Sequence, residues 1–193
     1  MENGVATRKP TANESREMME RARSGDREAF DILTKNYANM VIGLAYKLLG
    51  SREDSLDCAQ DAFVRAWENI DRYDPKWSVA TWLRRIVTNL ALDRLRRRSG
   101  KVELSEALEG SLTSTAEAPT EAAERHERAQ TVRSLLELLP EKYRLVLVLR
   151  DMEGVEISDI ARITGANAAT VRWRLHRARA LFRQHWLASA HRE

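Results

Sequence analysis

Residues 155–175, VEISDIARITGANAATVRWRL, have the pattern of two short helices joined by a tight turn. Isoleucines recur at three-residue intervals in the first half, which places them on one inward face of a helix. Gly165 supplies a turn in which a positive φ costs little. Asn167 is suited to cap the second helix. The sequence therefore predicts a helix-turn-helix in the last third of the chain.

The second helix of this motif is strongly basic. Six arginines and no acidic residue occur between residues 160 and 183. A helix of about 16 residues spans roughly 24 Å, which suits the major groove of DNA. Arg172 is expected to contact guanine, and the later arginines are expected to hold phosphates. The candidate DNA-binding residues of this helix are Asn167, Ala168, Thr170, Arg172, Trp173, Arg174, Arg177 and Arg179.

Two helices are expected between residues 26 and 70, because apolar residues there recur at intervals of three and four. Asp26 is placed to cap the first helix and Gly50 to end it. Ser51, followed three residues later by Asp54, resembles a capping box. The stripe expected to face inward on the second helix consists of Leu56, Ala59, Phe63, Trp67 and Ile70.

A third helix is expected after the polar break at residues 73–75, beginning at Ser78 or Thr81 and ending near Arg98. Residues 99–119 lack periodicity and contain Gly, Pro, Ser and Thr, which indicates a linker. The apolar run 145–149 is interpreted as a buried helix rather than a buried strand. The predicted fold class is all-α, with two small helical domains joined by a flexible linker. The expected boundaries are a disordered extension at 1–13, domains at 14–98 and 121–186, a linker at 99–120 and a tail at 187–193.

The predicted helix after residue 51 carries a cluster of acids, Glu53, Asp54, Asp57 and Asp61. Acids spaced four apart on a helix repel each other by a few tenths of a kcal/mol. Such a face suits a basic protein partner. It is equally consistent with a solvated face whose N-terminal acids are favoured by the helix dipole.

Aromatic residues adjoin a basic cluster at the start of the third helix. Seven bases and one acid occur from residue 78 to residue 101, next to Tyr73, Trp77 and Trp82. Rings that stack on unpaired bases, together with arginines that follow phosphates, are typical of single-stranded DNA binding. Trp82 lies on the apolar stripe and is expected in the core. Tyr73 and Trp77 lie in the polar break and are expected outside it.

Several classes of protein are excluded by composition. No apolar run approaches the roughly 18–20 residues that span a bilayer, so no membrane insertion is expected. The polar N-terminus lacks the apolar core of a signal peptide. Cys58 is the single cysteine, and no histidine is spaced to form a metal site with it. We therefore expect no catalytic residue, no metal ligand and no cofactor, and a cytoplasmic protein.

Motifs in four regions, in consistent order, resemble those of bacterial RNA polymerase sigma factors of the extracytoplasmic-function (ECF) subgroup. Residues 57–67, DCAQDAFVRAW, resemble the segment that binds core polymerase. Residues 81–97, TWLRRIVTNLALDRLRR, resemble the helix for the minus-10 promoter element. Residues 139–144 and 149–154, with LHRAR at 175–179, resemble the domain that reads the minus-35 element.

The resemblance implies a non-enzymatic role in transcription initiation. Such a protein binds core RNA polymerase, through a coiled coil of the largest subunit and the flap of the second subunit, and opens promoter DNA. A minus-10 base would enter a pocket formed in part by Tyr73 and Asn89. An anti-sigma factor is a further implied partner. The implied core-polymerase-binding residues are Asp57, Gln60, Asp61, Phe63, Arg65 and Trp67. The implied minus-10 residues are Tyr73, Trp77, Arg84, Arg85, Asn89, Arg94, Arg96 and Arg97.

The recognition helix departs from the family pattern. Asn167, Ala169 and Trp173 stand where the family usually has Pro, Gly and Ser, so the family's minus-35 preference is not carried over. One alternative is a stand-alone helix-turn-helix regulator, which would leave the acidic helix and residues 73–82 without a role. An enzyme acting on nucleic acid would need a metal cluster or an activated nucleophile, and neither is apparent.

Overall fold

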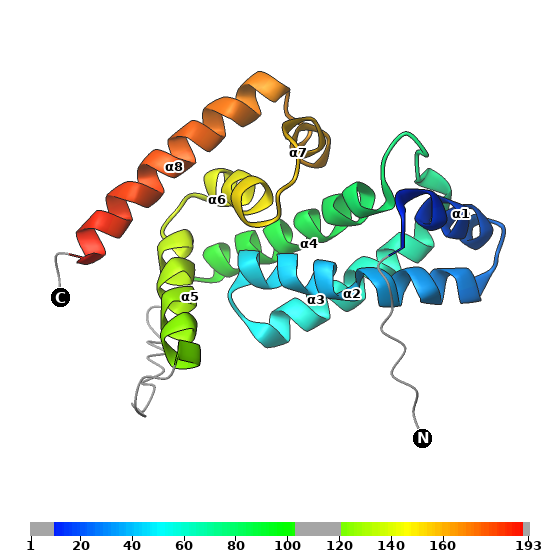
Figure 1. Ribbon diagram of the computed structural model, residues 1–193, viewed down its shortest axis with the longest axis horizontal. Coiled ribbons are helices and arrows are strands. Elements are labelled where there is room, and N and C mark those ends of the chain that lie inside the picture. The colour runs from blue at the N-terminus through cyan, green and yellow to red at the C-terminus, as the bar shows by residue number, and fades with distance from the viewer. Residues whose placement is uncertain (1–9, 103–120, 191–193) are drawn as a thin grey trace. The chain divides into compact units, whose positions relative to one another are not determined.

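The computed structural model describes residues 10–102 and 121–190 (Figure 1). Within these ranges every regular element is a helix, which confirms the all-α prediction. The described residues form two compact units, one comprising residues 10–91 with 161–166 and the other residues 92–102, 121–160 and 167–190. Most of the expected linker and most of the expected N-terminal extension lie outside the described residues. Among the described helices, none is long and apolar enough to cross a membrane.

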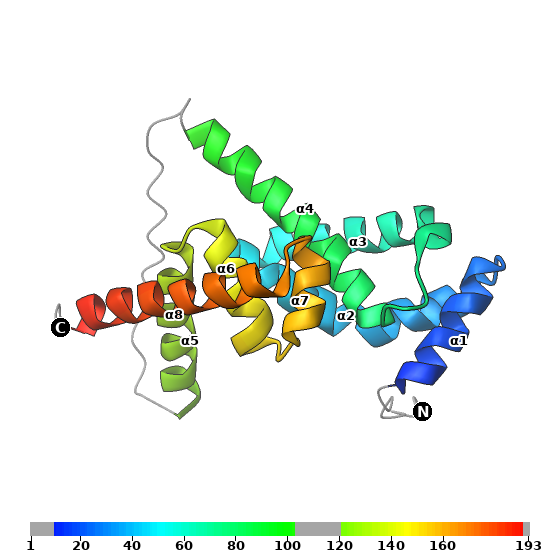
Figure 2. The ribbon, with the colours of Figure 1, turned by 90° about the horizontal axis from the view of Figure 1, so that it is seen from above.

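The first unit is a bundle built around α2. Its elements are α1 (Ala12–Arg23), α2 (Arg27–Leu49), α3 (Arg52–Glu68), the short 3₁₀ turn η1 (Ile70–Arg72) and the first half of α4 (Val79–Val102). Helix α2 packs against both α1 and α3 (Figures 1 and 2). The buried positions of α3 are small residues, whereas those of α2 include large aliphatic side chains. Because interaxial distance follows the size of the contacting side chains, α3 can lie close to α2.

Local capping signals determine where these helices begin and end. The Asp26 side chain accepts a hydrogen bond from the Ala29 N–H, and Gly50 ends α2 with a φ of 76°. The Ser51 side chain accepts from the Asp54 N–H at 3.3 Å. The Ser78 hydroxyl accepts from the Thr81 N–H at 3.0 Å, so Ser78 is the residue that caps α4. These contacts confirm the predicted caps.

The N-terminal extension expected at residues 1–13 ends earlier than predicted, because the first helix already begins at Ala12. Thr11 and Glu14 form a capping box in which each side chain accepts a hydrogen bond from the other residue's backbone N–H. This reciprocal pairing satisfies two of the donors that a helix start leaves open. Helix α1 therefore begins at Ala12, before the boundary expected from the sequence.

After residue 120 the chain forms α5 (Glu121–Glu137), α6 (Glu141–Leu147), the π-helical turn η2 (Val148–Met152), α7 (Ile157–Thr164) and α8 (Ala168–Ala190). Residues 145–149 are buried and helical, as predicted. Helix α8 packs against α5 and α6. It extends to Ala190, so it includes most of the expected tail, and α4 extends past Arg98 to Val102.

A buried arginine joins α5 to α6. The Arg144 side chain is 9% exposed, and its Nη2 donates to the carbonyl oxygens of Glu137 at 2.7 Å and Leu139 at 3.3 Å. These carbonyls belong to the end of α5 and the turn after it, where helical partners are lacking. Burial lowers the pKa of Arg144 from its ordinary value. Arg144 thus fixes the turn that carries α6.

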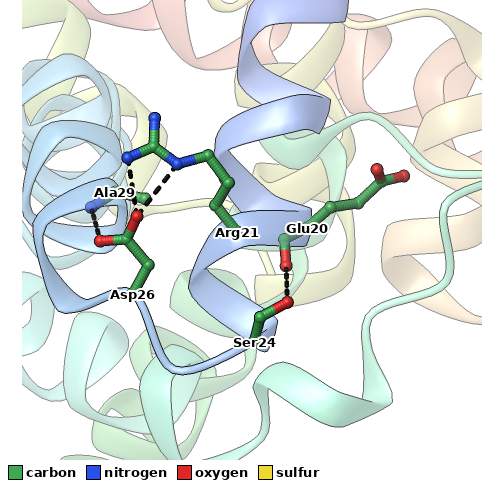
Figure 3. A network of polar contacts seen from close by, with 5 residues as sticks. All are labelled: Glu20, Arg21, Ser24, Asp26 and Ala29. Atoms are coloured by element: carbon green, nitrogen blue, oxygen red, sulfur yellow. Dashed lines mark hydrogen bonds and ion pairs between the residues drawn. The ribbon is translucent and has the colours of Figure 1, made fainter.

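The turn between α1 and α2 is held by one carboxylate (Figure 3). Asp26 Oδ1 accepts from the Ala29 N–H at 3.0 Å. Its Oδ2 accepts from Arg21 Nε at 3.0 Å and Nη2 at 2.7 Å. The hydrogen bond from Ala29, and then that from Arg21, lowers the pKa of Asp26 below its ordinary value of 3.8. The charged form of Asp26 therefore both caps α2 and ties it to α1.

Replacing Asp26 by Asn keeps a capping acceptor but removes the titrating charge. A carboxyl with a lowered folded-state pKa stabilises the fold above its unfolded value and loses that contribution as the pH falls through the folded value. We therefore expect the melting temperature of the wild type to exceed that of Asp26→Asn above pH 3.8 and the difference to shrink below it. Thermal unfolding followed by circular dichroism from about pH 6 to about pH 2 measures this.

The matched variant is Arg21→Met, which removes the second cause of the lowered pKa. Asp26→Asn is introduced both into the wild type and into the Arg21→Met protein. Its effect on the melting temperature should change less with pH in the Arg21→Met protein than in the wild type. An effect of Asp26→Asn that stays constant across the whole pH range would contradict the assignment.

Candidate nucleic-acid and protein interfaces

One side of α3 exposes acidic and apolar groups together. Asp57, Gln60 and Asp61 are exposed, and they are flanked by Leu56 at 40% and Val64 at 57% exposure. We call these five residues the α3 face. The expectation that Leu56 faces inward is wrong, because the buried positions of α3 are Ser55, Cys58, Ala59, Ala62 and Ala66. The sequence signal that was missed is the four-residue spacing of Leu56, Gln60 and Val64.

An apolar hollow adjoins the α3 face. Its volume is about 510 Å³, and its lining residues are Asn39, Ile42, Gly43 and Tyr46 of α2 and Arg52, Ser55 and Leu56 of α3. Exposed apolar area beside charged groups is typical of a protein-binding surface, because the charges orient a partner while the apolar groups lose water.

The other predicted core-polymerase-binding residues do not join this face. Phe63 and Trp67 are half-buried, and the Trp67 ring lies 5.0 Å from that of Phe30 on α2, so it packs within the bundle. Arg65 is exposed but lines a different pocket. The structure therefore exposes Asp57, Gln60 and Asp61 together on one side of α3, whereas Phe63 and Trp67 are half-buried and Arg65 also lines the second pocket.

The second pocket of the first unit combines rings, amides and bases. Its volume is about 510 Å³. It lies between the end of α3, the segment 69–77 and the first three turns of α4. Three arginines and two asparagines face it against a single acid, so it suits an anionic ligand that also carries a ring. The lining residues are Arg65, Asn69, Arg72, Asp74, Trp77, Trp82, Arg85, Ile86 and Asn89.

Tyr73 is a core residue, which corrects the expectation that it lies outside the core. It is 3% exposed, and its ring meets that of Trp82 edge-on at 5.4 Å. Its hydroxyl donates to the Trp77 carbonyl oxygen at 2.7 Å. Burial raises the pKa of Tyr73 above its ordinary value. Trp82 is also buried, as predicted.

The segment between Tyr73 and Ser78 presents Trp77 at the pocket. The Trp77 N–H donates to the Asp74 carbonyl oxygen at 2.9 Å, which closes a tight turn. The Arg85 guanidinium lies 5.1 Å from the centroid of the Trp77 ring, within the range of a cation–π contact. Trp77 is therefore half-buried and oriented by contacts on both its backbone and its ring.

The remaining predicted minus-10 residues on α4 do not line this pocket. Arg84 is half-buried beside the lining residue Arg85. Arg94 is half-buried, and Arg96 and Arg97 are exposed on later turns of the helix. They extend the basic character of α4 without contributing to the pocket wall.

Helix α8 has an exposed stripe of basic and apolar residues along its first turns. Ala169, Arg172, Trp173 and His176 are exposed, while Val171, Leu175 and Ala178 are buried on another side of the helix. We call the four exposed residues the reading stripe. Asn167 caps the helix as predicted, because its Oδ1 accepts from the Thr170 N–H at 2.8 Å. Gly165 has a φ of 66°, which confirms its predicted turn.

The other candidates on α8 have different surroundings. Ala168, Thr170 and Arg174 are half-buried, and Arg177 is exposed. Arg179 donates from Nε and Nη2 to the two carboxylate oxygens of Asp151 at 2.9 and 2.6 Å. This paired contact raises the pKa of Arg179. Arg179 thus makes an ion pair within the protein, and its expected role as a phosphate ligand stays a prediction.

Further along α8 lies an apolar groove of about 520 Å³. The rings of Phe182 and Trp186 stack in it with centroids 6.3 Å apart. Trp186 is 42% exposed. The lining residues of the groove are Val132, Leu136, Leu147, Asp151, Met152, Arg179, Phe182, Arg183 and Trp186. No group of three or more metal-ligating side chains occurs in the described residues.

Comparison with known proteins assigns both halves of the chain to one family. The model of Sigma-70 region 2 matches residues 33–101, and that of Sigma-70 region 4 matches residues 129–182. These ranges contain the two pockets of the first unit and the reading stripe, respectively.

Relatives cover nearly the whole chain. The ECF RNA polymerase sigma factor SigW of Bacillus subtilis is 31% identical over 86% of this chain and 93% of its own length. The ECF RNA polymerase sigma-E factor of Escherichia coli K12 is 32% identical over 84% of this chain and 88% of its own. The structure of CnrH in complex with the cytosolic domain of CnrY is similar, with a TM-score of 0.70, 27% identity, and coverage of 91% of this chain and 98% of that one.

Three findings lead to one conclusion. The two sigma regions occur in the family's order, the relatives match almost end to end, and the helical fold is shared with a solved structure. The chain belongs to the ECF RNA polymerase sigma factors, the proteins that bind core RNA polymerase and direct it to promoters.

Proposed function

We propose that the surfaces of this chain divide the work of a sigma factor between polymerase and DNA. The observation that carries the proposal is the separation within the first unit of an acidic, apolar surface from a basic, aromatic pocket. A basic protein fits the first, and unpaired DNA fits the second. The proposed domains are 14–98 and 121–186, extended to include Thr11 and the end of α8.

The α3 face and the adjoining hollow are proposed to bind the coiled coil of the largest polymerase subunit. Asp57 and Asp61 supply the charge, while Leu56 and Val64 supply apolar area that the sequence pattern did not assign. Water leaves this area on docking, which favours association. Phe63 and Trp67 are half-buried, and Trp67, which packs on Phe30, is proposed to support the face from beside it.

The pocket beside Trp77 is proposed to receive a base of the minus-10 element. A base taken out of the stack loses a few kcal/mol of stacking and pairing, which a ring and hydrogen-bond donors can offset. Asn89 and Asn69 offer amide groups for the base edge, and Arg65 joins the DNA-binding residues. Tyr73 acts indirectly, because it is buried and fixes the turn that presents Trp77.

In the second unit, the reading stripe with Arg177 is proposed to contact the minus-35 element. The apolar groove beyond it is proposed to hold the flap of the second polymerase subunit, because its walls offer apolar groups that cannot pair with phosphates. Arg179 contributes to the wall of this groove. The same helix would then touch DNA at one end and polymerase at the other.

In this proposal the chain catalyses no reaction itself, since the polymerase forms the phosphodiester bond, and it acts in the cytoplasm. An inhibitory anti-sigma protein is proposed as a further partner. The similar protein CnrH was solved bound to the cytosolic domain of another protein, CnrY, which supports such a partner.

Run-off transcription tests the function. Bacterial core polymerase is supplied with a randomised promoter pool, with and without this protein. Protein-dependent transcripts that share two upstream motifs are expected. Tight, specific binding of the free protein to a palindrome, without any binding to core polymerase, would favour a stand-alone regulator instead.

Removing the charges of the α3 face should weaken core binding. Exposed ion pairs contribute about 0.2–1 kcal/mol each, so the double variant Asp57→Asn, Asp61→Asn should lower the affinity for core polymerase about 2- to 30-fold at low salt. The difference should shrink as salt rises, because salt screens exposed charges. Fluorescence anisotropy of labelled protein titrated with core polymerase measures both effects.

The matched control is Asp31→Asn, which removes an exposed acid of α2 outside the α3 face. It should leave the affinity unchanged. An equal loss for this control would show a general charge effect, and an unchanged affinity of the double variant would show that the face lies elsewhere.

Trp77→Ala should weaken capture of an unpaired base. Stacking on an aromatic ring is worth about 1–3 kcal/mol per base, so holoenzyme affinity for a fork-junction minus-10 template should fall about 5- to 150-fold. Wild-type holoenzyme should lose the same affinity when the template has an abasic site in place of the captured base. No further loss should occur when the variant meets the abasic template.

The neighbouring exposed residue gives the control. Lys76→Ala lies outside the pocket lining and should keep the wild-type sensitivity to the abasic site. Additive losses from Trp77→Ala and the abasic site would mean that the ring does not contact the missing base.

A further inference from the structure

The reading stripe of α8 contains a large exposed apolar ring. Trp173 is 59% exposed, one residue beyond the exposed Arg172. Removing water from an exposed indole ring lowers the free energy when the ring comes to pack against another apolar group. Its neighbours on the exposed side of the helix are basic or small, and no acidic residue occurs between residues 160 and 183. A polyanion that fits these arginines and also offers an apolar group would cover the exposed part of the Trp173 ring.

The indole is held by a second aromatic residue from another helix. The ring of Tyr143 on α6 lies with its centroid 6.1 Å from that of Trp173, tilted by 57°. Lys142 Nζ lies 5.1 Å from the centroid of the Tyr143 ring. Tilted aromatic pairs at this separation attract each other. Because α6 is anchored by its buried residues 144–147, Tyr143 restricts the directions in which Trp173 can point.

DNA offers one apolar group to a helix in the major groove, the C5-methyl group of thymine. Side chains of the first turns of a recognition helix are those that reach base edges. Trp173 lies in the second turn of α8, which begins at Ala168. A ring already restricted by Tyr143 loses less conformational freedom on binding, which favours a defined contact over a loose one.

We propose that Trp173 is a specificity-determining residue that contacts a thymine methyl in the upstream promoter element, and that Tyr143 is the positioning residue that orients it. The inference rests on the proposed reading of the minus-35 element by α8. It assigns Tyr143 a role for which its sequence position gave no sign.

The test uses holoenzyme and the upstream motif selected from the randomised promoter pool. Each thymine of that motif is replaced in turn by deoxyuridine, which removes only the methyl group. Burying one methyl-sized group is worth about 0.8 kcal/mol, so the affinity of the wild type should fall about fourfold at one position. Other thymines should show no such penalty.

Variants separate contact from positioning. In Trp173→Ser the deoxyuridine penalty should vanish, and in Tyr143→Ala it should diminish. In Tyr143→Phe it should persist, because the ring remains. Gln184→Ser, an exposed residue further along α8, is the control and should keep the full penalty. Because Trp173 is exposed, its replacement should leave the melting temperature nearly unchanged.

The outcomes distinguish this inference from the proposed function. A selected upstream motif in which no thymine is sensitive to deoxyuridine overturns the inference and leaves the proposed function standing. A penalty that survives Trp173→Ser also overturns it. The absence of any upstream motif in the selected pool overturns the proposed reading by α8 and the inference with it.

Discussion

The packing of α3 against α2 is the constraint on which the surfaces of the first unit depend. The buried side of α3 consists of Ser55, Cys58, Ala59, Ala62 and Ala66, none of which is large. Since a helix turns by a fixed angle per residue, burying this side determines where every other residue of α3 points. It turns Asp57 and Asp61 outward, and it brings Arg65 to the pocket that Trp77 and Asn89 also line. One packing contact therefore separates the α3 face, proposed to bind protein, from the pocket proposed to bind DNA.

The core and the pocket of the first unit share a residue. Tyr73 buries its ring against Trp82 while its hydroxyl holds the Trp77 carbonyl. A buried hydroxyl without an acceptor would cost about 1–3 kcal/mol, so this hydrogen bond favours one conformation of the turn. The position of the half-buried Trp77 ring is thus determined by Tyr73, which is buried and does not line the pocket. The presence of Tyr73 and Trp77 in the same polar segment does not by itself indicate which of the two rings faces the pocket.

The features that the sequence predicts correctly are local. Asp26, Ser78 and Asn167 cap helices by accepting hydrogen bonds from backbone N–H groups only three residues away. Such contacts depend on neighbouring residues alone, so the local sequence is enough to predict them. The sequence pattern places Leu56 on the wrong side because its helix has two nearly equal stripes, and only packing on α2 decides between them. The ion pair of Arg179 could not be predicted from the sequence, because its partner Asp151 lies 28 residues earlier in the chain. Such tertiary contacts leave no periodic signal.

The length of α8 joins two of the proposed tasks. Its 23 residues carry Trp173 near one end and Trp186 near the other. At 1.5 Å per residue these rings are about 20 Å apart along one axis. A continuous helix packed on α5 and α6 bends little, so a partner that fills the apolar groove also fixes the direction of the reading stripe. A partner bound in the apolar groove would restrict the motion of α8 before DNA binds. Less conformational freedom would then be lost when α8 binds DNA, so the partner would strengthen promoter recognition without touching the DNA.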